Sequence, residues 1–435
     1  MDDGQVPYMR SATKTTSVIP AVALQHAGEC AALGRVRSTL LRAPHVRLVQ
    51  LDRLDERLAA HFDGVRLADS FGVQICEQAL ETPDEGSVFT FAVRAIEDRS
   101  ARRLEKLAAL VGAVPDALPA VMGGFGWVST EALRGITVPL LSSEDPRRRS
   151  IGLAACAMHG VDPGRVLDDS LQHSDSFLRA RALRVAAEVG RADLLPEARR
   201  ALQDEVPAVR YRAAWSACLL GDRQNSIQVL AELAQSGERF SHGALHLVSL
   251  AASFEWTHEF LRGLPTPEGR DLPMTRRLIR ASGLTGNIAY VPWLIRQMDD
   301  EKLARIAGEA FSFISGADLA WLDLERRPPE HFESGPNDDP DDDDVAMDED
   351  EGLPWPDKAK VEAWWNANAD RFRPGIRYFV GAPPTWEHCL HILKTGYQRQ
   401  RVAAAQFRCL LRPGTPLFNT SAPAWRQKRL LDAMT

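Results

Sequence analysis

A unit of 30 to 31 residues recurs through the middle of the chain, and this period constrains the fold more than any other feature of the sequence. Residues 149–160, 179–190 and 210–221 align without a gap. Each segment opens with an arginine and closes with a glycine, and these six residues are Arg149, Arg179, Arg210, Gly160, Gly190 and Gly221. A fixed period of this length is typical of solenoids, in which each unit packs on its neighbours.

The local sequence of each unit predicts a pair of helices. An acidic or polar turn precedes each segment and supplies N-cap chemistry, and the closing glycine is a C-cap signal. Small side chains before that glycine let neighbouring helices approach closely, and they include Ala182, Ala213 and Ala217. A shorter amphipathic segment follows each glycine and completes a helical hairpin.

Similar helix ends continue outward, so about seven or eight hairpins are expected between roughly residues 80 and 330. A helix over residues 51–68, with Leu51, Leu54 and Leu58 on one face, is expected to cap the first hairpin. Because one hairpin cannot bury its apolar face alone, stacking predicts an all-α protein with the architecture of an α-solenoid. The units resemble HEAT repeats, in particular the short kind of phycobilisome-lyase-like proteins, and residues 204–222 are a close match.

The recurring Arg149, Arg179 and Arg210 have two possible roles. They could form a ladder that binds anions, or each could pair with a turn acid of its own or the neighbouring repeat, as HEAT repeats generally do. We favour the second role, and we assign the repeated arginines, alanines and glycines to the fold.

The formal net charge of -7 is concentrated in one segment. Ten of the fourteen residues in 338–351 are Asp or Glu, and without them the charge becomes +3. Prolines and dense like charge prevent a segment from burying enough apolar surface to offset its ordering entropy. We therefore expect an acidic, disordered linker over residues 331–352.

This linker separates two predicted domains. A partly disordered N-terminal segment (1–45) precedes the solenoid with its cap (46–330), and a small, mostly helical module (353–435) follows the linker. The module has thirteen Lys and Arg residues against five Asp and Glu, and it holds five of the ten tryptophans. It is therefore basic and rich in tryptophan.

The module is expected to recognise a protein partner. Aromatic residues and arginine dominate interface hot spots. The candidate partner-binding residues are Arg399, Arg401, Arg408, Arg426, Lys428, Trp386, Tyr397 and Trp425. The alternative is that the rings build the module's own core, which leaves the basic side chains as the better candidates. The acidic linker could screen them until an acidic partner displaces it.

The sequence offers no motif for catalysis or cofactor binding. P-loop, dinucleotide, nucleophile-elbow and zincin patterns are all missing. His242 and His246 share a helix face, and residues 387–391 hold a Glu, two His and a Cys, but neither set has a complementary ligand elsewhere. We predict no catalytic residue, no metal and no cofactor.

Several features predict a cytoplasmic protein. The longest apolar runs fall far short of the roughly 20 residues that span a membrane, and the acidic N-terminus does not resemble a signal peptide. Six cysteines without a CxxC pair suit reduced, buried thiols.

The charge balance of the repeats argues against a nucleic-acid partner. Residues 1–337 carry 39 basic against 44 acidic residues, so nucleic-acid binding is unlikely. The sequence leaves the oligomeric state open.

The ends of the chain resemble a bacterial family of HEAT-repeat proteins associated with type VI secretion gene clusters. The resemblance rests on the helix of residues 51–68 and on Gly396-Tyr-Gln-Arg-Gln-Arg, Pro416-Leu-Phe and Pro423-Ala-Trp-Arg-Gln. It extends over most of the chain from about residue 20, except the acidic run. It implies an accessory role in loading or chaperoning effectors, with effector, spike or adaptor proteins as partners, and it implies no catalytic residues.

The favoured function is therefore a non-enzymatic protein-binding scaffold or adaptor. Two other classes stay open. A chromophore lyase built on HEAT repeats would show a titratable cluster on one solenoid face and tetrapyrrole absorbance. A nucleic-acid-binding protein would show a continuous basic face along the repeats.

Overall fold

The computed structural model describes residues 18–237, 239–264, 271–332, 334–335 and 347–434. These residues form 22 α-helices, several short 3-10 helices and no β-strand. The predicted all-α class and the predicted solenoid are confirmed.

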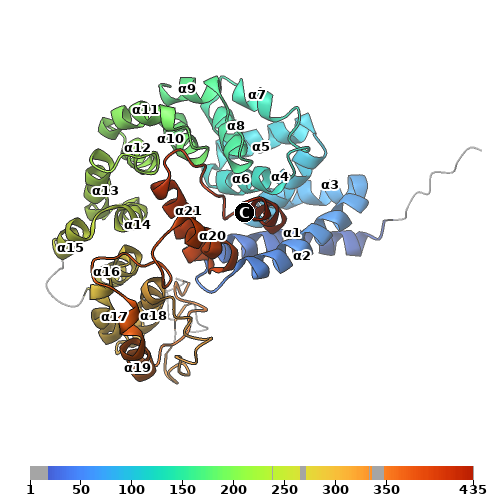
Figure 1. Ribbon diagram of the computed structural model, residues 1–435. Helices are drawn as coiled ribbons and strands as arrows, with labels where there is room; N and C mark the ends of the chain where they lie inside the picture. The colour runs from blue at the N-terminus through green and yellow to red at the C-terminus, as the bar shows by residue number, and fades with distance from the viewer. Residues whose placement is uncertain (1–17, 238, 265–270, 333, 336–346, 435) are drawn as a thin grey trace, which may run out of the picture.

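The helices stack in two rows that follow an arc (Figure 1). The inner row consists of α4 (Glu85–Glu97), α6 (Leu118–Trp127), α8 (Pro146–Met158), α10 (Ser176–Glu188), α12 (Pro207–Leu219), α14 (Ser241–Ala251), α16 (Leu272–Thr285) and α18 (Glu301–Ser315). The outer row consists of α5 (Ala101–Ala113), α7 (Thr137–Leu141), α9 (Arg165–Leu171), α11 (Leu195–Arg200), α13 (Asn225–Gln235), α15 (Phe254–Arg262) and α17 (Val291–Gln297). The short 3-10 turns η3 (Ala192–Leu194) and η5 (Ile288–Tyr290) precede the outer helices α11 and α17, whereas η2 (Pro115–Ala117) precedes the inner helix α6.

The small residues and the glycines of the repeats lie at helix contacts and helix ends, respectively. Ala182, Ala213 and Ala217 have no exposed surface and lie where successive inner helices pack. The glycines that close the inner helices have positive φ angles, which favour glycine because it lacks a Cβ; these are Gly160 (70°), Gly190 (76°) and Gly221 (117°). After each of them, the next N–H bonds to the carbonyl five residues back, at 2.8–2.9 Å.

The repeated arginines hold the turns between units. Arg179 pairs with Asp204 of the neighbouring repeat at 2.9 Å and also donates to the carbonyl of His173. Arg149 and Arg210 instead donate to backbone carbonyls of their own turns, at Ser143 (2.7 Å) and at Asp204 (2.9 Å). The expected pairing with a turn acid therefore holds for one side chain, whereas the other two bind turn backbone.

The solenoid begins earlier than predicted. Residues 1–45 were expected to be a partly disordered segment, but α1 (Pro20–Leu40) packs against α2 (Leu48–Leu67), α3 (Asp69–Gln78) and α4. Its buried Cys30 belongs to the same apolar core as Leu58 and Phe91. Residues 1–17 lie outside the described part of the chain.

The last 83 residues do not form a separate module, which corrects the predicted domain division. The helix α19 (Lys358–Asn368) extends the stack beside α17, and its Val361 shares a core with Leu294 and Phe311. The remaining helices are α20 (Trp386–Thr395), α21 (Gln398–Leu411) and α22 (Ala424–Asp432). Figure 1 shows α20 and α21 inside the arc. They share a core with Leu250 of α14 and Phe313 of α18.

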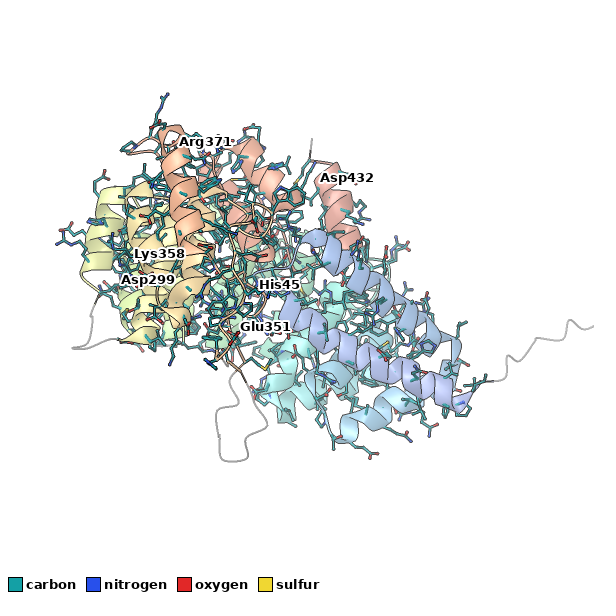
Figure 2. The ribbon with its side chains drawn as sticks, turned by 90° about the horizontal axis from the view of Figure 1, so that it is seen from below. His45, Asp299, Glu351, Lys358, Arg371 and Asp432 are labelled. Atoms are coloured by element: carbon teal, nitrogen blue, oxygen red, sulfur yellow. The ribbon has the colours of Figure 1, made fainter. Side chains whose placement is uncertain are left out.

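The predicted acidic linker is partly docked. Residues 333 and 336–346 lie outside the described residues, but residues 347–352 lie against the solenoid. Figure 2 shows Glu351 beside His45, whose Nδ1 lies 3.2 Å from the Glu351 carbonyl oxygen. The same figure shows Asp299 beside Lys358, a pair that joins the end of α17 to the start of α19 at 2.5 Å.

Candidate partner-binding site

The inner face of the solenoid is occupied by the chain's own C-terminal residues. The glycines that end the inner helices permit this close approach. A Cβ at Gly190 would lie 2.3 Å from the carbonyl oxygen of Gly414, and one at Gly286 would lie 2.1 Å from that of Tyr378. Gly316 is similarly close to Val380. These positions need glycine for the backbone conformation and for the approach of the C-terminal chain.

Arginines bind the two parts together at the carbonyl ends of helices. Arg426 donates to the carbonyls of Gly126 (3.0 Å) and Val128 (2.6 Å), at the end of α6. Arg377 donates to Ser249 and Ala252, at the end of α14. Helix C-termini carry partial negative charge and unpaired carbonyls. A guanidinium group there donates hydrogen bonds to the carbonyls and interacts favourably with the negative charge. Much of the basic surplus of the C-terminal residues therefore acts inside the molecule.

Three of the predicted partner-binding arginines are buried, which corrects their assignment to an exposed surface. Arg401 has no exposed surface and donates to the Leu393 carbonyl (2.8 Å) and to the side-chain oxygens of Gln398 (2.7 Å) and Gln427 (2.5 Å). Arg426 is 4% exposed. Burial lowers the pKa of both guanidinium groups to about 10. A partner cannot reach either group in this arrangement.

Arg408 is also buried, at 6% exposure, and it stacks on the ring of Trp386 at 3.8 Å. Arg412 lies on the same ring at 4.2 Å. Such contacts are cation–π interactions, which stabilise the fold without an acidic partner. Trp386 is half-buried between these arginines, so most of its surface serves the fold.

Two of the predicted residues are exposed at α22. Trp425 is 44% exposed, beside Arg426 and Arg429. Lys428 is half-exposed and pairs with Asp52 of α2. Both are accessible, but they lie apart from any described cavity.

The last two, Tyr397 and Arg399, line a cavity. The hydroxyl of Tyr397 donates to Asp318 at 3.0 Å, and Arg47 binds the same carboxylate at 2.6 Å. Arg399 donates to the carboxylate of Glu309 at 2.8 Å. These residues connect α21 with the start of the solenoid and with α18.

The Arg399–Glu309 pair stands between two cavities. The large cavity has a volume of about 1080 Å³ and includes residues of both charges. Its ionic and imidazole side chains are His45, Arg47, Glu309, Asp318, Asp323, Glu325, Arg326, Arg327, His388, His391 and Arg399. The small cavity has a volume of about 380 Å³ and is lined by Arg42, His242, His246, Arg277, Arg280, Glu309, Arg399 and apolar side chains. Because only one of these is acidic, the small cavity is strongly cationic.

Beside the small cavity, four arginines hold the end of the acidic segment. We call Arg276, Arg280, Arg305 and Arg399 the arginine clamp, and Asp348, Glu349 and Asp350 the acidic triplet. Two of the contacts are bidentate, and this geometry makes strong, specific pairs. Arg276 binds Asp350 at 2.7 and 2.8 Å, and Arg305 binds Asp348 at 2.7 and 3.1 Å.

The remaining contacts involve the middle of the triplet. Arg280 binds the carboxylate of Glu349 at 3.1 Å, and Arg399 donates to the Glu349 carbonyl at 3.0 Å. Asp350 is 2% exposed. The guanidinium of Arg305 also lies 5.1 Å from the ring centre of Phe332 and 4.9 Å from that of Trp355. The clamp is thus built from both charge and aromatic packing.

The clamp changes the acidity of Asp348 and Glu349. Burial alone would raise the pKa of Asp348 and Glu349, but the neighbouring arginines outweigh it and lower both values. For Asp348 the hydrogen bond from Arg305 contributes most to this lowering, and for Glu349 it is the charge of Arg280. Asp348 and Glu349 are therefore fully ionised near neutral pH.

Sequence reasoning missed Arg276, Arg280 and Arg305. A signal was present, because Arg276 and Arg280 are four residues apart and share a face of α16. Their spacing alone does not indicate which acidic segment they bind, because that partner is distant in the sequence.

The candidate metal ligands have other roles. His246 is bonded to Gln406 at 2.7 Å, and His388 to the carbonyl of Phe379 at 2.7 Å. Cys389 has no exposed surface, and burial raises its pKa to about 12. Glu387 and His391 are exposed. Within the described part of the chain, no group of three His, Cys, Asp or Glu residues is arranged to hold a metal ion.

Comparison with known proteins concerns the middle of the chain. A family model of HEAT repeats matches residues 165–242, which span α9 to the start of α14. The chain contains HEAT repeats. The aligned units from α8 to α12 extend them toward the N-terminus with the same helix ends. The chain matches no curated protein and no solved structure.

HEAT repeats generally serve as scaffolds for protein interactions. In this chain their inner face is covered by α20 and α21, so the accessible features are the two cavities, the arginine clamp and the outer helices. Among the described residues, no helix combines the length and apolar character needed to cross a membrane.

Proposed function

We propose that this chain is a non-enzymatic adaptor that binds effector, spike or adaptor proteins of a type VI secretion system. The HEAT repeats support the general role in protein binding. The resemblance of residues 51–68 and of the C-terminal motifs to a family associated with these secretion clusters supports the particular system. A protein that meets effectors before export works in the cytoplasm, and its six free, buried cysteines suit a reducing compartment.

The observation that carries this proposal is the large cavity where the α1–α2 loop meets α18, α20 and the start of α21. It is about 1080 Å³ in volume and has a lining of both charges, including Arg47, Asp318 and Tyr397. Arginine and tyrosine are enriched in protein-recognition surfaces. A cavity made by α1–α2, α18 and α20–α21 together exists only while the C-terminal helices are docked.

Affinity purification of the tagged full chain from its native host, followed by mass spectrometry, tests the proposal. We expect secretion effectors or spike proteins to be enriched. The matched control is the Asp318→Asn variant, which removes the charge that Arg47 and Tyr397 share while keeping the side-chain volume. Recovery of a tetrapyrrole or of nucleic acid, with no secretion protein, would contradict the proposal.

A further inference from the structure

The docked acidic triplet shows what the clamp recognises. Asp348 and Asp350 each accept two hydrogen bonds from one guanidinium, and the Glu349 and Asp350 carbonyls accept bonds from Arg399 and Arg305. Side chains and main chain are thus bound together. This pattern suits a short acidic peptide rather than a single small anion.

The small cavity next to the clamp gives the site an apolar part. Arg280 and Arg399 belong both to the clamp and to the cavity lining. Behind them the cavity is lined by the apolar side chains of Leu41, Leu245, Leu284, Ile306, Phe313 and Val402. No residue of the triplet is among the described lining residues. The triplet therefore satisfies the arginines without using the apolar part of the cavity.

We propose that the arginine clamp and the small cavity bind an acidic segment of a partner protein that carries an apolar side chain beside its carboxylates. The chain's own triplet occupies the acidic half of this site in cis. This inference rests on the proposed function, since it names the chemistry of the partner.

The cis triplet makes the site selective. A tethered segment competes at a high effective concentration, so a purely acidic partner gains little by replacing it. A partner with an apolar anchor buries an additional side chain in the cavity, and the triplet cannot match that contact. The site should thus reject general polyanions and accept acidic segments with an adjacent Leu, Ile or Phe.

Fluorescence anisotropy with the full chain tests this inference. The probe is a fluorescein-labelled peptide, Gly-Leu-Asp-Glu-Asp-Leu-Gly. One control peptide replaces both Leu by Ser, and another replaces the acids by Asn and Gln. We expect the variant Asp348→Asn/Glu349→Gln/Asp350→Asn to bind the probe about tenfold more tightly than the unaltered chain. Both control peptides should bind at least about tenfold more weakly than the probe, and binding should weaken as salt rises.

Single substitutions keep the test decisive if the triple variant does not fold. The Glu349 side chain is 64% exposed and contacts only Arg276 and Arg280 among the described pairs, so Glu349→Gln should fold normally. It should bind the probe about threefold more tightly than the unaltered chain. The matched control is Glu351→Gln, an exposed neighbour with no described ion pair, which should leave binding unchanged. Equal probe affinity in all folded variants would overturn the inference and leave the triplet as a structural strap.

A last comparison separates this inference from the proposed function. If the full chain captures secretion proteins and an Arg276→Gln/Arg280→Gln variant captures them equally well, the adaptor function stands and the site is elsewhere. If the probe binds as expected but no secretion protein is captured, the site stands and the proposed function is wrong.

Discussion

Buried guanidinium groups are the most informative single residues of this protein. Arg401 and Arg426 bind neutral oxygens of backbone and glutamine side chains rather than carboxylates. Removing such a group leaves several buried acceptors unpaired, which costs more than the hydrogen bonds were worth. These arginines therefore stabilise one particular docking of the C-terminal helices.

Arg401→Ala should lower the free energy of unfolding by about 3 kcal/mol, because three buried acceptors lose their donor. Urea unfolding followed by circular dichroism measures this loss. The control is Arg102→Ala, whose side chain is 87% exposed and should change stability by less than about 0.5 kcal/mol. Equal stability of the two variants would show that Arg401 is not held as described.

His159 should make stability depend on pH. Its Nε2–H donates to the Phe125 carbonyl at 2.8 Å, and burial together with the charge of Arg426 lowers its pKa from 6.5 to about 4. Between these values the unfolded chain binds a proton that the folded chain does not, so stability falls as the pH falls.

Replacing His159 by Gln keeps a donor and removes this titration. Between pH 7 and pH 5 the unaltered chain should lose about 1–2 kcal/mol more stability than His159→Gln does. Urea unfolding at both pH values gives the comparison. Parallel losses in the two chains would contradict the description of His159 as a neutral, buried group.

The ends of the inner helices serve two purposes. A glycine with positive φ follows α8, α10, α12, α16 and α18, and several of these glycines also touch the C-terminal chain. The first purpose is local to the repeat. The second depends on which part of the chain passes over that helix end, so equivalent glycines have unequal surroundings.

Gly160 and Gly190 are a matched pair for testing this difference. Their φ angles are 70° and 76°, but a Cβ at Gly160 meets nothing within 4 Å, whereas one at Gly190 meets the Gly414 carbonyl. Gly160→Ala should cost about 1 kcal/mol from backbone strain alone. Gly190→Ala should cost at least about 2 kcal/mol more, because the backbone at residue 414 must move. Thermal unfolding of both variants checks the order, and equal losses would place residues 413–416 away from the repeat.

For the whole molecule, the C-terminal helices complete the solenoid instead of following it. Phe313 and Leu250 of the inner row share their core with Phe379, Ile392 and Phe407. Removing one part exposes the apolar surface of the other. The chain from α1 to α22 should consequently unfold as one coupled unit.

A chain shortened to end at Pro384, which lacks α20, α21 and α22, should be destabilised by more than about 5 kcal/mol, since each buried Leu or Phe contributes about 1.5–3 kcal/mol. Differential scanning calorimetry and binding of a hydrophobic dye measure the effect. Supplying residues 385–435 as a second, coexpressed chain should restore the transition. A shortened chain that melts as the full chain does would support two independent domains.

The repeats can be predicted from the amino-acid sequence alone, because their signals are local. An N-cap turn, small residues on one helix face and a closing glycine lie within one unit of about thirty residues, and the same physics acts wherever the unit occurs. Gly160, Gly190 and Gly221 could therefore be placed at helix ends without any tertiary information. The all-α class and the solenoid follow from repetition of that unit.

The roles of the charged residues, in contrast, depend on contacts between distant parts of the chain. The basic surplus after residue 352 suggested an exposed surface, yet Arg426 binds a carbonyl 300 positions away in the chain, at Gly126. The acidic run suggested a free linker, yet Asp348 and Asp350 bind Arg305 and Arg276. A charge pattern states that a group needs a partner but not which one, because the partner is fixed by how the whole chain closes on itself. The candidate site could be found only after the arc had formed and its inner face had been filled.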